Sequence, residues 1–259
     1  MGRKKIDRTG EEKLNNFSSK MIIKEYRSAR DIDVYFPEYN WTFEHTQYSN
    51  FKNGTIKCPY ERRYYNKGYL GEGKYTMSEN GKNSDGYIIW YNALKRCYDP
   101  EFQEKEPTYK GCTMEDYLLN FQHMCEWLEE NYYEVPGEKM CLDKDILCKG
   151  NKIYSRDTCM FVPQRINTLF IKCDKSRGGN PIGVIELLSG NYHVQCNDGY
   201  GKQIHLGTYS TKEEAFQVYK QYKEKVIKEV IDSYEGIIPE LFYSRLKTAM
   251  YNYKVEIDD

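Results

Sequence analysis

The chain has 259 residues and a formal net charge of −1 at pH 7, from 38 Lys and Arg against 39 Asp and Glu. Charged residues make up 30% of the chain and apolar residues 39%, and the mean hydropathy is −0.84. This composition excludes a uniformly basic nucleic-acid-binding protein and favours several small cores over one large core.

No apolar run approaches the roughly 20 residues that a membrane helix requires, and the start of the chain lacks the apolar segment of a signal peptide. We therefore expect a cytoplasmic protein without membrane contact. Nine cysteines occur without a C-x-x-C pair, which argues against a zinc site and a disulfide framework. Residues 1–30 hold nine Lys and Arg against four Asp and Glu, so this basic segment can neutralise phosphates.

Residues 1–75 contain strand-like runs and no long helical pattern. The runs are rich in β-branched and aromatic side chains, and a Gly-rich segment closes them. We predict a small β-barrel module with a basic N-terminus. The runs are Met21–Ile23, Ile32–Phe36 and Gly54–Pro59.

Three motifs in this region resemble a module of phage and Firmicutes proteins. They read K-M-x-I-x-x-Y-R from Lys20, D-I-D-V-x-F from Asp31 and I-K-x-P from Ile56. The resemblance implies a Src-homology-three-like barrel. Lys24 and Arg27 are its candidate DNA contacts, and packing without DNA contact is the alternative.

In residues 76–175 the spacing of the apolar residues changes to that of a helix. Ser84 is placed to cap a helix, and a second helix is expected to open at Thr113 with Asp116 in the capping position. A turn at 149–151, a strand at 159–163 and a short helix through Asn167 follow. The first helix carries one apolar stripe, formed by Trp90, Ala93, Leu94 and Cys97.

The motifs of this region are similar to those of the phage HNH endonuclease family. That family carries W-x-x-M-x-x-R-C-Y, Y-x-G, E-W-x-x-F, L-D-x-x and Y-S-P-E-N-C in this order. The similarity covers roughly residues 75–172 and implies a metal-dependent phosphodiesterase, with Asp143 and Asn167 as ligands of Mg²⁺ or Mn²⁺. Lys144 stands at the position of the catalytic base, and Thr158 stands where the middle Asn would be. The matching segments begin at Trp90, Tyr109, Phe121, Leu142 and Tyr154.

The lysine at the base position leaves two interpretations of this centre. A Lys is protonated at neutral pH unless burial lowers its pKa by several units, so Lys144 is a poor base. In an active enzyme, Asp143, Asp145 and Asn167 would bind the metal, and the metal or Asp145 would activate the attacking water. Lys144 would stabilise the developing negative charge. In an enzyme that has lost its activity, the centre would bind DNA without cutting it, and Lys144 and Lys149 would contact phosphates. We expect cleavage to be weak or lost.

A third interpretation comes from the acidic segment Glu126–Asn131. Clustered carboxylates can imitate DNA, so a phage-encoded chain could bind and inhibit a bacterial defence nuclease in the host cytoplasm. Carboxylates on a helix are usually a solvated face.

Residues 181–232 predict a three-stranded sheet followed by a helix. Alternation directs Val194, Cys196 and Leu206 to one face and polar side chains to the other. Thr211 and Glu214 form a capping box before an amphipathic helix. A flexible linker is expected at 177–180, and a docking helix is expected within residues 237–259. The polar face is formed by His193, Gln195, Asn197, Gln203 and His205.

The G-V, L-G-T-Y and T-x-E-E-A signatures of this region, beginning at Gly183, Leu206 and Thr211, resemble the apetala-two/ethylene-response DNA-binding domain. Double-stranded DNA is therefore the expected partner. Asn and Gln can pair bidentately with adenine in the major groove, so Gln195, Asn197, Gln203 and His205 are the candidate base contacts. Together the patterns predict a multidomain α+β protein related to phage homing endonucleases.

Overall fold

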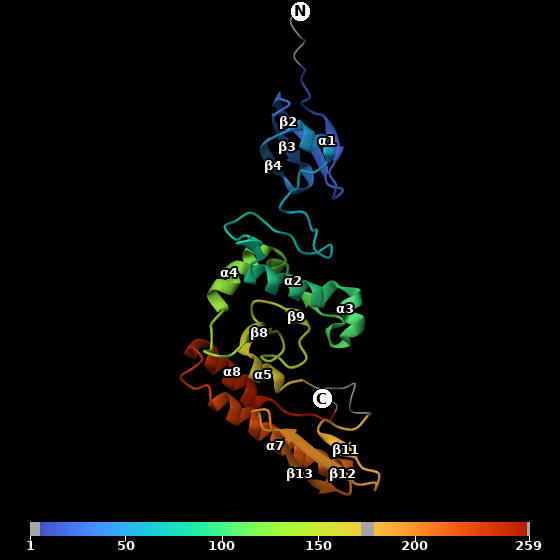
Figure 1. Cartoon of the computed structure of the whole chain (residues 1–259), viewed down its shortest axis with the longest axis vertical. Coiled ribbons are helices and arrows are strands. Elements are labelled where there is room, and N and C mark those ends of the chain that lie inside the picture. The colour runs from blue at the N-terminus through green and yellow to red at the C-terminus, as the bar shows by residue number, and fades with distance from the viewer. Residues whose placement is uncertain (1–5, 172–178, 258–259) are drawn as a thin grey trace, which may run out of the picture. The chain divides into compact units, whose positions relative to one another are not determined.

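The computed structural model describes residues 6–171 and 179–257. Helices and several small sheets alternate along the chain (Figure 1), so the predicted mixture of α and β structure is confirmed. The linker expected at 177–180 lies mostly outside the described residues. Among the helices of the described ranges, none is long and apolar enough to cross a membrane.

The chain divides into two compact units. Unit 1 comprises residues 1–110 and 114–126, and unit 2 comprises residues 111–113 and 127–259. This division differs from the domain boundaries predicted from the sequence. Residues of the region similar to HNH endonucleases lie in both units. The hairpin at residues 140–163 and the C-terminal sheet belong to the same unit.

Unit 1 begins with a four-stranded antiparallel sheet in the order β1-β2-β3-β4. Alternation explains β3, in which Ile32, Val34 and Phe36 are fully buried and the intervening residues are half-buried. The strands and the helix that follows them are β1 Glu12–Leu14, β2 Lys20–Ser28, β3 Asp31–Phe36, β4 Trp41–Thr46 and α1 Tyr48–Asn53.

The sheet is an open meander, and a closed barrel is not detected in the described residues. The segment expected to supply the closing strand, Gly54–Pro59, has no strand pairing. Its polar groups bond elsewhere: the Thr55 N–H donates to the Asn50 carbonyl, and the Ile56 carbonyl accepts from Asn15 Nδ2. Pro59 has no N–H to donate to a ladder. The segment still contributes the buried side chains Ile56 and Cys58 to the core beneath the sheet.

The rest of unit 1 is mainly helical. The predicted first helix is confirmed as α2, capped by the Ser84 side chain, which accepts from the Tyr87 N–H. Its predicted apolar stripe is buried. The elements are β5 Ser78–Glu79, β6 Lys82–Asn83, α2 Asp85–Tyr98 and α3 Pro100–Lys105, with 3-10 turns at Pro37–Tyr39, Pro107–Tyr109 and Asp116–Leu119. The unit boundaries fall within β7 Thr113–Met114 and α4 Phe121–Asn131.

The predicted start of the second helix at Thr113 is wrong, because α4 begins at Phe121. The Tyr69 N–H donates to the Leu119 carbonyl, and the Phe121 N–H donates to the Tyr69 carbonyl. These bonds accompany an extended backbone at Asn120, which separates the 3-10 turn ending at Leu119 from α4. The Asn120 side chain then accepts from the Gln122 N–H, as a residue before a helix does.

Unit 2 combines the hairpin at residues 140–163 with the C-terminal sheet. Strands β8 and β10 pair antiparallel, with Asp143 opposite Met160, and α5 follows β10 and packs on both strands. Arg165 of α5 donates to the Gly199 carbonyl at 2.9 Å and stacks on the Tyr200 ring, which joins the hairpin to the sheet. The elements are β8 Met140–Asp143, β9 Ile153–Tyr154, β10 Met160–Pro163 and α5 Gln164–Thr168.

The predicted C-terminal sheet and helix are both present. Strands β11, β12 and β13 form an antiparallel sheet in sequence order, and α7 covers one of its faces. Thr211 caps α7 by accepting from the Glu214 N–H at 3.2 Å. The docking helix expected near the end is α8, which packs against α7. The elements are β11 Val184–Glu186, β12 Tyr192–Asn197, β13 Gln203–Tyr209, α7 Lys212–Asp232 and α8 Glu240–Asn252.

Candidate nuclease-like centre and nucleic-acid interface

The predicted centre lies where β8 ends. Strand pairing with β10 carries the backbone to Asp143, and the chain then turns into the loop that holds Lys144 and Asp145. Asp143 Oδ1 fixes this turn by accepting the Asp145 N–H at 2.8 Å and the Ile146 N–H at 2.7 Å. The turn therefore depends on a carboxylate that was predicted to bind metal.

Asp143 is half-buried. Burial raises the pKa of its carboxyl to about 6, and the nearby charge of Asp145 acts in the same direction. The two backbone N–H donors oppose these effects by stabilising the carboxylate. Asp143 and Asp145 are thus close enough to repel each other when both are ionised.

Lys144 is buried, with 6% of its surface exposed. Its Nζ lies 3.1 Å from Asp145 Oδ2. Burial alone would lower the pKa of Lys144, but the charge of Asp145 and its hydrogen bond to Lys144 outweigh burial and raise it. Lys144 therefore holds its proton at neutral pH and cannot accept one from water. Because its ammonium is enclosed and paired, contact between Lys144 and a phosphate would also require rearrangement.

Asn151 organises the loop after the centre, a role that the sequence analysis missed. Its Nδ2 donates to the Lys144 carbonyl at 2.6 Å and to the Ile153 carbonyl at 2.7 Å. The only sequence signal was a turn-forming Gly-Asn pair. Thr158, at the place of the family's middle Asn, makes a different local turn with the Ser155 hydroxyl at 2.7 Å.

Asn167, the second expected metal ligand, lies in α5 beside the hairpin. In the described part of the chain, no hydrogen bond joins it to Asp143. The structure thus brings Asp143, Lys144 and Asp145 together and leaves Asn167 on the neighbouring helix. Its assignment as a ligand stays a prediction.

The candidate base contacts lie on the sheet face opposite α7. Gln195 pairs with His205, and Asn197 pairs with Gln203. Gln203 and His205 are exposed, whereas Gln195 and Asn197 are half-buried. The ring of His205 stacks on His193 at 4.5 Å.

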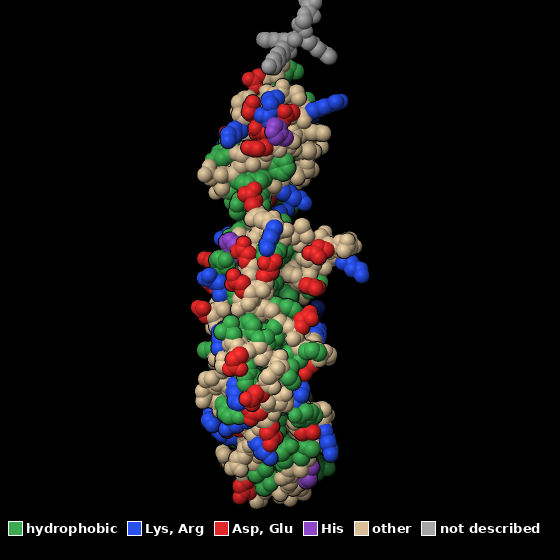
Figure 2. Space-filling view, turned by 90° about the vertical axis from the view of Figure 1, so that its left-hand side faces the viewer, with side chains coloured by type: hydrophobic (Ala, Val, Ile, Leu, Met, Phe, Trp, Pro, Cys, Tyr) green, Lys and Arg blue, Asp and Glu red, His purple; other side chains and the backbone are tan. Residues whose placement is uncertain are grey.

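Two features limit how this face can bind DNA. Asn197 Oδ1 accepts the Gly199 N–H at 2.8 Å, so its amide is partly used within the β12–β13 turn. The three strands, all within the described ranges, contain Glu186 but no Lys or Arg. Lys and Arg are also interspersed with Asp and Glu on the face of the molecule shown in Figure 2. Contacts to phosphate must therefore come from outside the strands.

The candidate DNA contacts of unit 1 differ in their surroundings. Lys24 is exposed, and its Nζ lies 3.4 Å from Thr42 Oγ1. Arg27 is bound by three carboxylates, with Nη1 at 2.7 Å from Glu25 and Nε at 2.7 Å from Asp31, and with a third ion pair to Asp33. A phosphate would have to compete with these carboxylates for Arg27.

Asp31, Asp33 and His45 come close enough to hold a metal ion. Arg27 already lies among them, and its hydrogen bonds together with that of His45 lower the pKa of Asp31 to about 2. Arg27 likewise lowers the pKa of Asp33. The arginine supplies the positive charge that a cation would bring, so this cluster is a salt-bridge network.

The acidic side chains Glu126, Glu129 and Glu130 are exposed, and Trp127 and Leu128 beside them are buried. This is the pattern of an amphipathic helix with a solvated face. It does not single out a protein partner, and inhibition of a defence nuclease stays a prediction.

Comparisons with known proteins give no relative: no family model, no curated protein and no solved structure matches the chain.

Proposed function

We propose that the chain is a double-stranded-DNA-binding protein with an HNH-like centre in which cleavage is weak or lost. The resemblance to phage homing endonucleases motivates the proposal, and the geometry of unit 2 supports it. Lys144 replaces the base and is held as a buried, protonated partner of Asp145. A centre without a general base could still bind nucleic acid.

The open face of the C-terminal sheet is the observation that carries the DNA-binding part. Helix α7 covers the other face, so the amides of Gln195 and Gln203 and the ring of His205 are directed away from the core. A small sheet can enter the major groove, and an amide can pair with adenine there by two hydrogen bonds. Sequence reading would come from this face, and most of the affinity would come from phosphate contacts elsewhere.

The test is fluorescence anisotropy with duplex DNA at several salt concentrations. The double variant Gln195→Ala and Gln203→Ala should lose preference between duplexes by about 1–3 kcal/mol per lost amide pair. The matched control is Gln217→Ala with Gln221→Ala, which removes two exposed amides from α7. Unchanged preference in the sheet variant would remove base reading from this face. Absence of any salt-dependent binding would remove the proposed function.

A Mg²⁺-dependent endonuclease is the second candidate, and one observation favours it. Asp143 and Asp145 lie close enough for the charge of one to raise the pKa of the other, and a divalent cation would relieve their repulsion. The carboxylates of Asp143 and Asp145 would hold the ion, with the Asn167 amide as a third oxygen donor. The fit is partial, because Lys144 already neutralises Asp145. When bound, such an ion would polarise the phosphodiester.

Nicking of supercoiled plasmid in Mg²⁺ or Mn²⁺ separates the two candidates. The first candidate predicts little or no nicking by the purified chain. Metal-dependent nicking that disappears in Asp143→Ala would establish the second candidate. Glu134→Gln is a suitable control, since Glu134 is an exposed carboxylate of unit 2 outside this loop.

A further inference from the structure

A groove of about 790 Å³ opens in unit 2 beside the nuclease-like centre. One wall is the loop that follows Asp145, at residues 146–149, together with residues 157–158. The other wall is α8 and the segment after it, at residues 244–256. The volume lies within the range of organic ligand sites, roughly 300–1,000 Å³. Neither the HNH-like motifs nor the sheet face accounts for this groove.

Helix α8 turns a polar stripe toward the groove. Ser244, Thr248 and Asn252 follow one another at intervals of four residues, so they lie on one side of the helix. Leu246 and Met250, on the other side, are buried. The hydroxyls of Ser244 and Thr248 donate to carbonyls one turn earlier, at 3.0 and 2.8 Å, which leaves their lone pairs directed outward.

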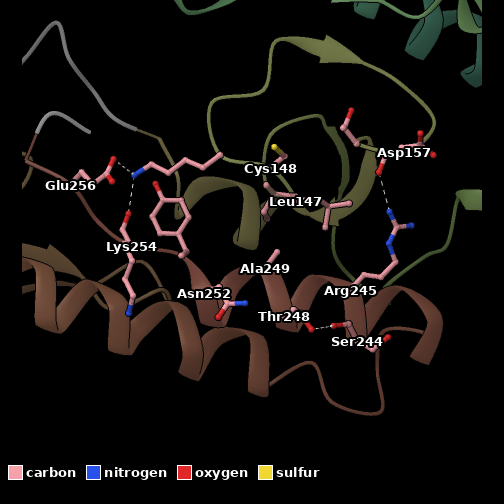
Figure 3. Close-up of a pocket in the computed structure, with 14 residues that line it drawn as sticks. Leu147, Cys148, Asp157, Ser244, Arg245, Thr248, Ala249, Asn252, Lys254 and Glu256 are labelled. Carbon is pink, nitrogen blue, oxygen red and sulfur yellow. Dashed lines mark hydrogen bonds and ion pairs between the residues drawn. The ribbon is translucent and has the colours of Figure 1, made fainter.

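Positively charged side chains flank both ends of the stripe. Figure 3 shows Arg245 reaching Asp157 at one end, whereas at the other end the Lys254 side chain points away from the loop. The Lys149 ammonium lies there instead, bonded to the Lys254 carbonyl and to Glu256. Arg245 donates from Nη2 to the Asp157 carbonyl at 3.1 Å, and within the described ranges it has no carboxylate partner. Lys254 is 61% exposed, and its Nζ lies 3.6 Å from Glu224. Arg245 can therefore reach a ligand at little cost, whereas Lys254 must leave Glu224 and turn toward the groove to do so.

The span of the groove matches a short stretch of polynucleotide. Arg245 and Asn252 are seven residues apart on α8, or roughly 10 Å at 1.5 Å per residue. Phosphates in one strand of a duplex are spaced by about 3.4 Å along its axis, so roughly three phosphates would fit this length. Polar side chains and cations along one edge suit a sugar-phosphate backbone better than an apolar ligand.

We propose that this groove binds the sugar-phosphate backbone of one nucleic-acid strand. The inference rests on the proposed function and names the phosphate contacts that the C-terminal sheet lacks. Arg245 and Lys254 contact phosphates, and the α8 stripe accepts or relays hydrogen bonds from sugar and water. The strand then passes beside the loop that follows Asp145.

Cys148 gives a direct probe of groove occupancy. It lines the groove and is exposed, whereas the other described cysteines are buried or half-buried. The rate of its alkylation by N-ethylmaleimide is measured by peptide mass spectrometry, with and without a duplex or single-stranded oligonucleotide. At a DNA concentration ten times Kd, mass action predicts alkylation about tenfold slower. High salt should restore the rate.

Arg245→Gln tests the contact itself. Loss of one phosphate contact should weaken binding to all sequences alike and reduce the salt slope by about 1. Lys225→Gln is the matched control, because Lys225 is an exposed cation on α7 outside the groove and has only an i,i+4 pair with Glu229. It should leave both the affinity and the protection of Cys148 unchanged.

The outcomes separate this inference from the proposed function. If DNA binds but Cys148 reacts at its free rate and Arg245→Gln binds normally, the groove inference is wrong and DNA binding stands. If no DNA binds, both fail. If polyglutamate protects Cys148 as well as DNA does, the groove is a general polyanion site and the inference is overturned.

Discussion

Asp143→Asn should remove a pH-dependent weakness of the hairpin formed by β8 and β10. The pKa of Asp143 is raised to about 6 by burial and by Asp145, from an ordinary value of 3.8. Between these values the folded chain holds a proton that the unfolded chain releases. Stability of the wild type is therefore full below pH 4 and is lost as pH rises through 6.

The size of the effect follows from the shift. Roughly two pH units at about 1.4 kcal/mol each give an upper limit near 3 kcal/mol. Because Asp143 is only half-buried, solvent screening reduces the expectation to roughly 1–2 kcal/mol. Asn keeps an oxygen that can accept the Asp145 and Ile146 N–H groups, so the turn survives. The variant should match the wild type at pH 4 and exceed its stability at pH 7.

Hydrogen exchange at the backbone amides of β8 and β10 is the appropriate assay. The chain has two compact units, so a single melting temperature would not isolate the hairpin. Exchange is measured from pH 4 to 7 in the presence of a chelator and corrected for the intrinsic rate at each pH. Asp157→Asn should follow the wild type. Parallel profiles for wild type and Asp143→Asn, or a less stable variant at pH 7, would refute the reasoning.

Three further changes test the C-terminal sheet and α7. Thr211→Ala removes the cap that accepts the Glu214 N–H and should lower the free energy of unfolding by about 1 kcal/mol in urea titrations. Gly183→Ala should cost roughly 2–4 kcal/mol by the same measurement, because its φ is +75° and a Cβ would meet the Tyr219 ring at 2.0 Å. Lys223→Met should stabilise the unit at pH 7, since burial lowers the pKa of Lys223. The wild type loses stability as pH falls below 10.5. In urea titrations, the difference in the free energy of unfolding between variant and wild type should therefore be smaller at pH 10 than at pH 7.

Elements whose signal is local were the predictable part of the fold. The buried stripe of α2, the cap of α7 and the two faces of the C-terminal sheet depend on periodicity within one element. The start of α4 was not predictable in this way. It depends on hydrogen bonds between Tyr69 and the backbone around Asn120, whose partners are some fifty residues apart in the sequence.

The candidate site was likewise predictable from the sequence only in part. Adjacent residues such as Asp143, Lys144 and Asp145 must lie close together, and the sequence identified them. The sequence did not show that Lys144 would be buried against Asp145, or that Arg27 would be enclosed by carboxylates, because rotamer and burial decide both. The α8 groove lies between a helix and loops about one hundred residues away in the sequence, so no local pattern could have indicated it.

Lys144 affects both the charge balance of the centre and the reaction that the centre could catalyse. An ammonium and a divalent ion would both neutralise Asp145, and two cations within hydrogen-bond distance of one carboxylate repel each other. A metal on the other oxygen of Asp145 would therefore be held weakly, and one that displaced Lys144 would leave a buried ammonium without its partner, which is strongly destabilising. An ammonium supplies positive charge but no coordination position at which water or phosphate could be activated. Lys144 thus disfavours catalysis in the turn after β8, and the groove along α8 is the more accessible place for the phosphate backbone that we propose.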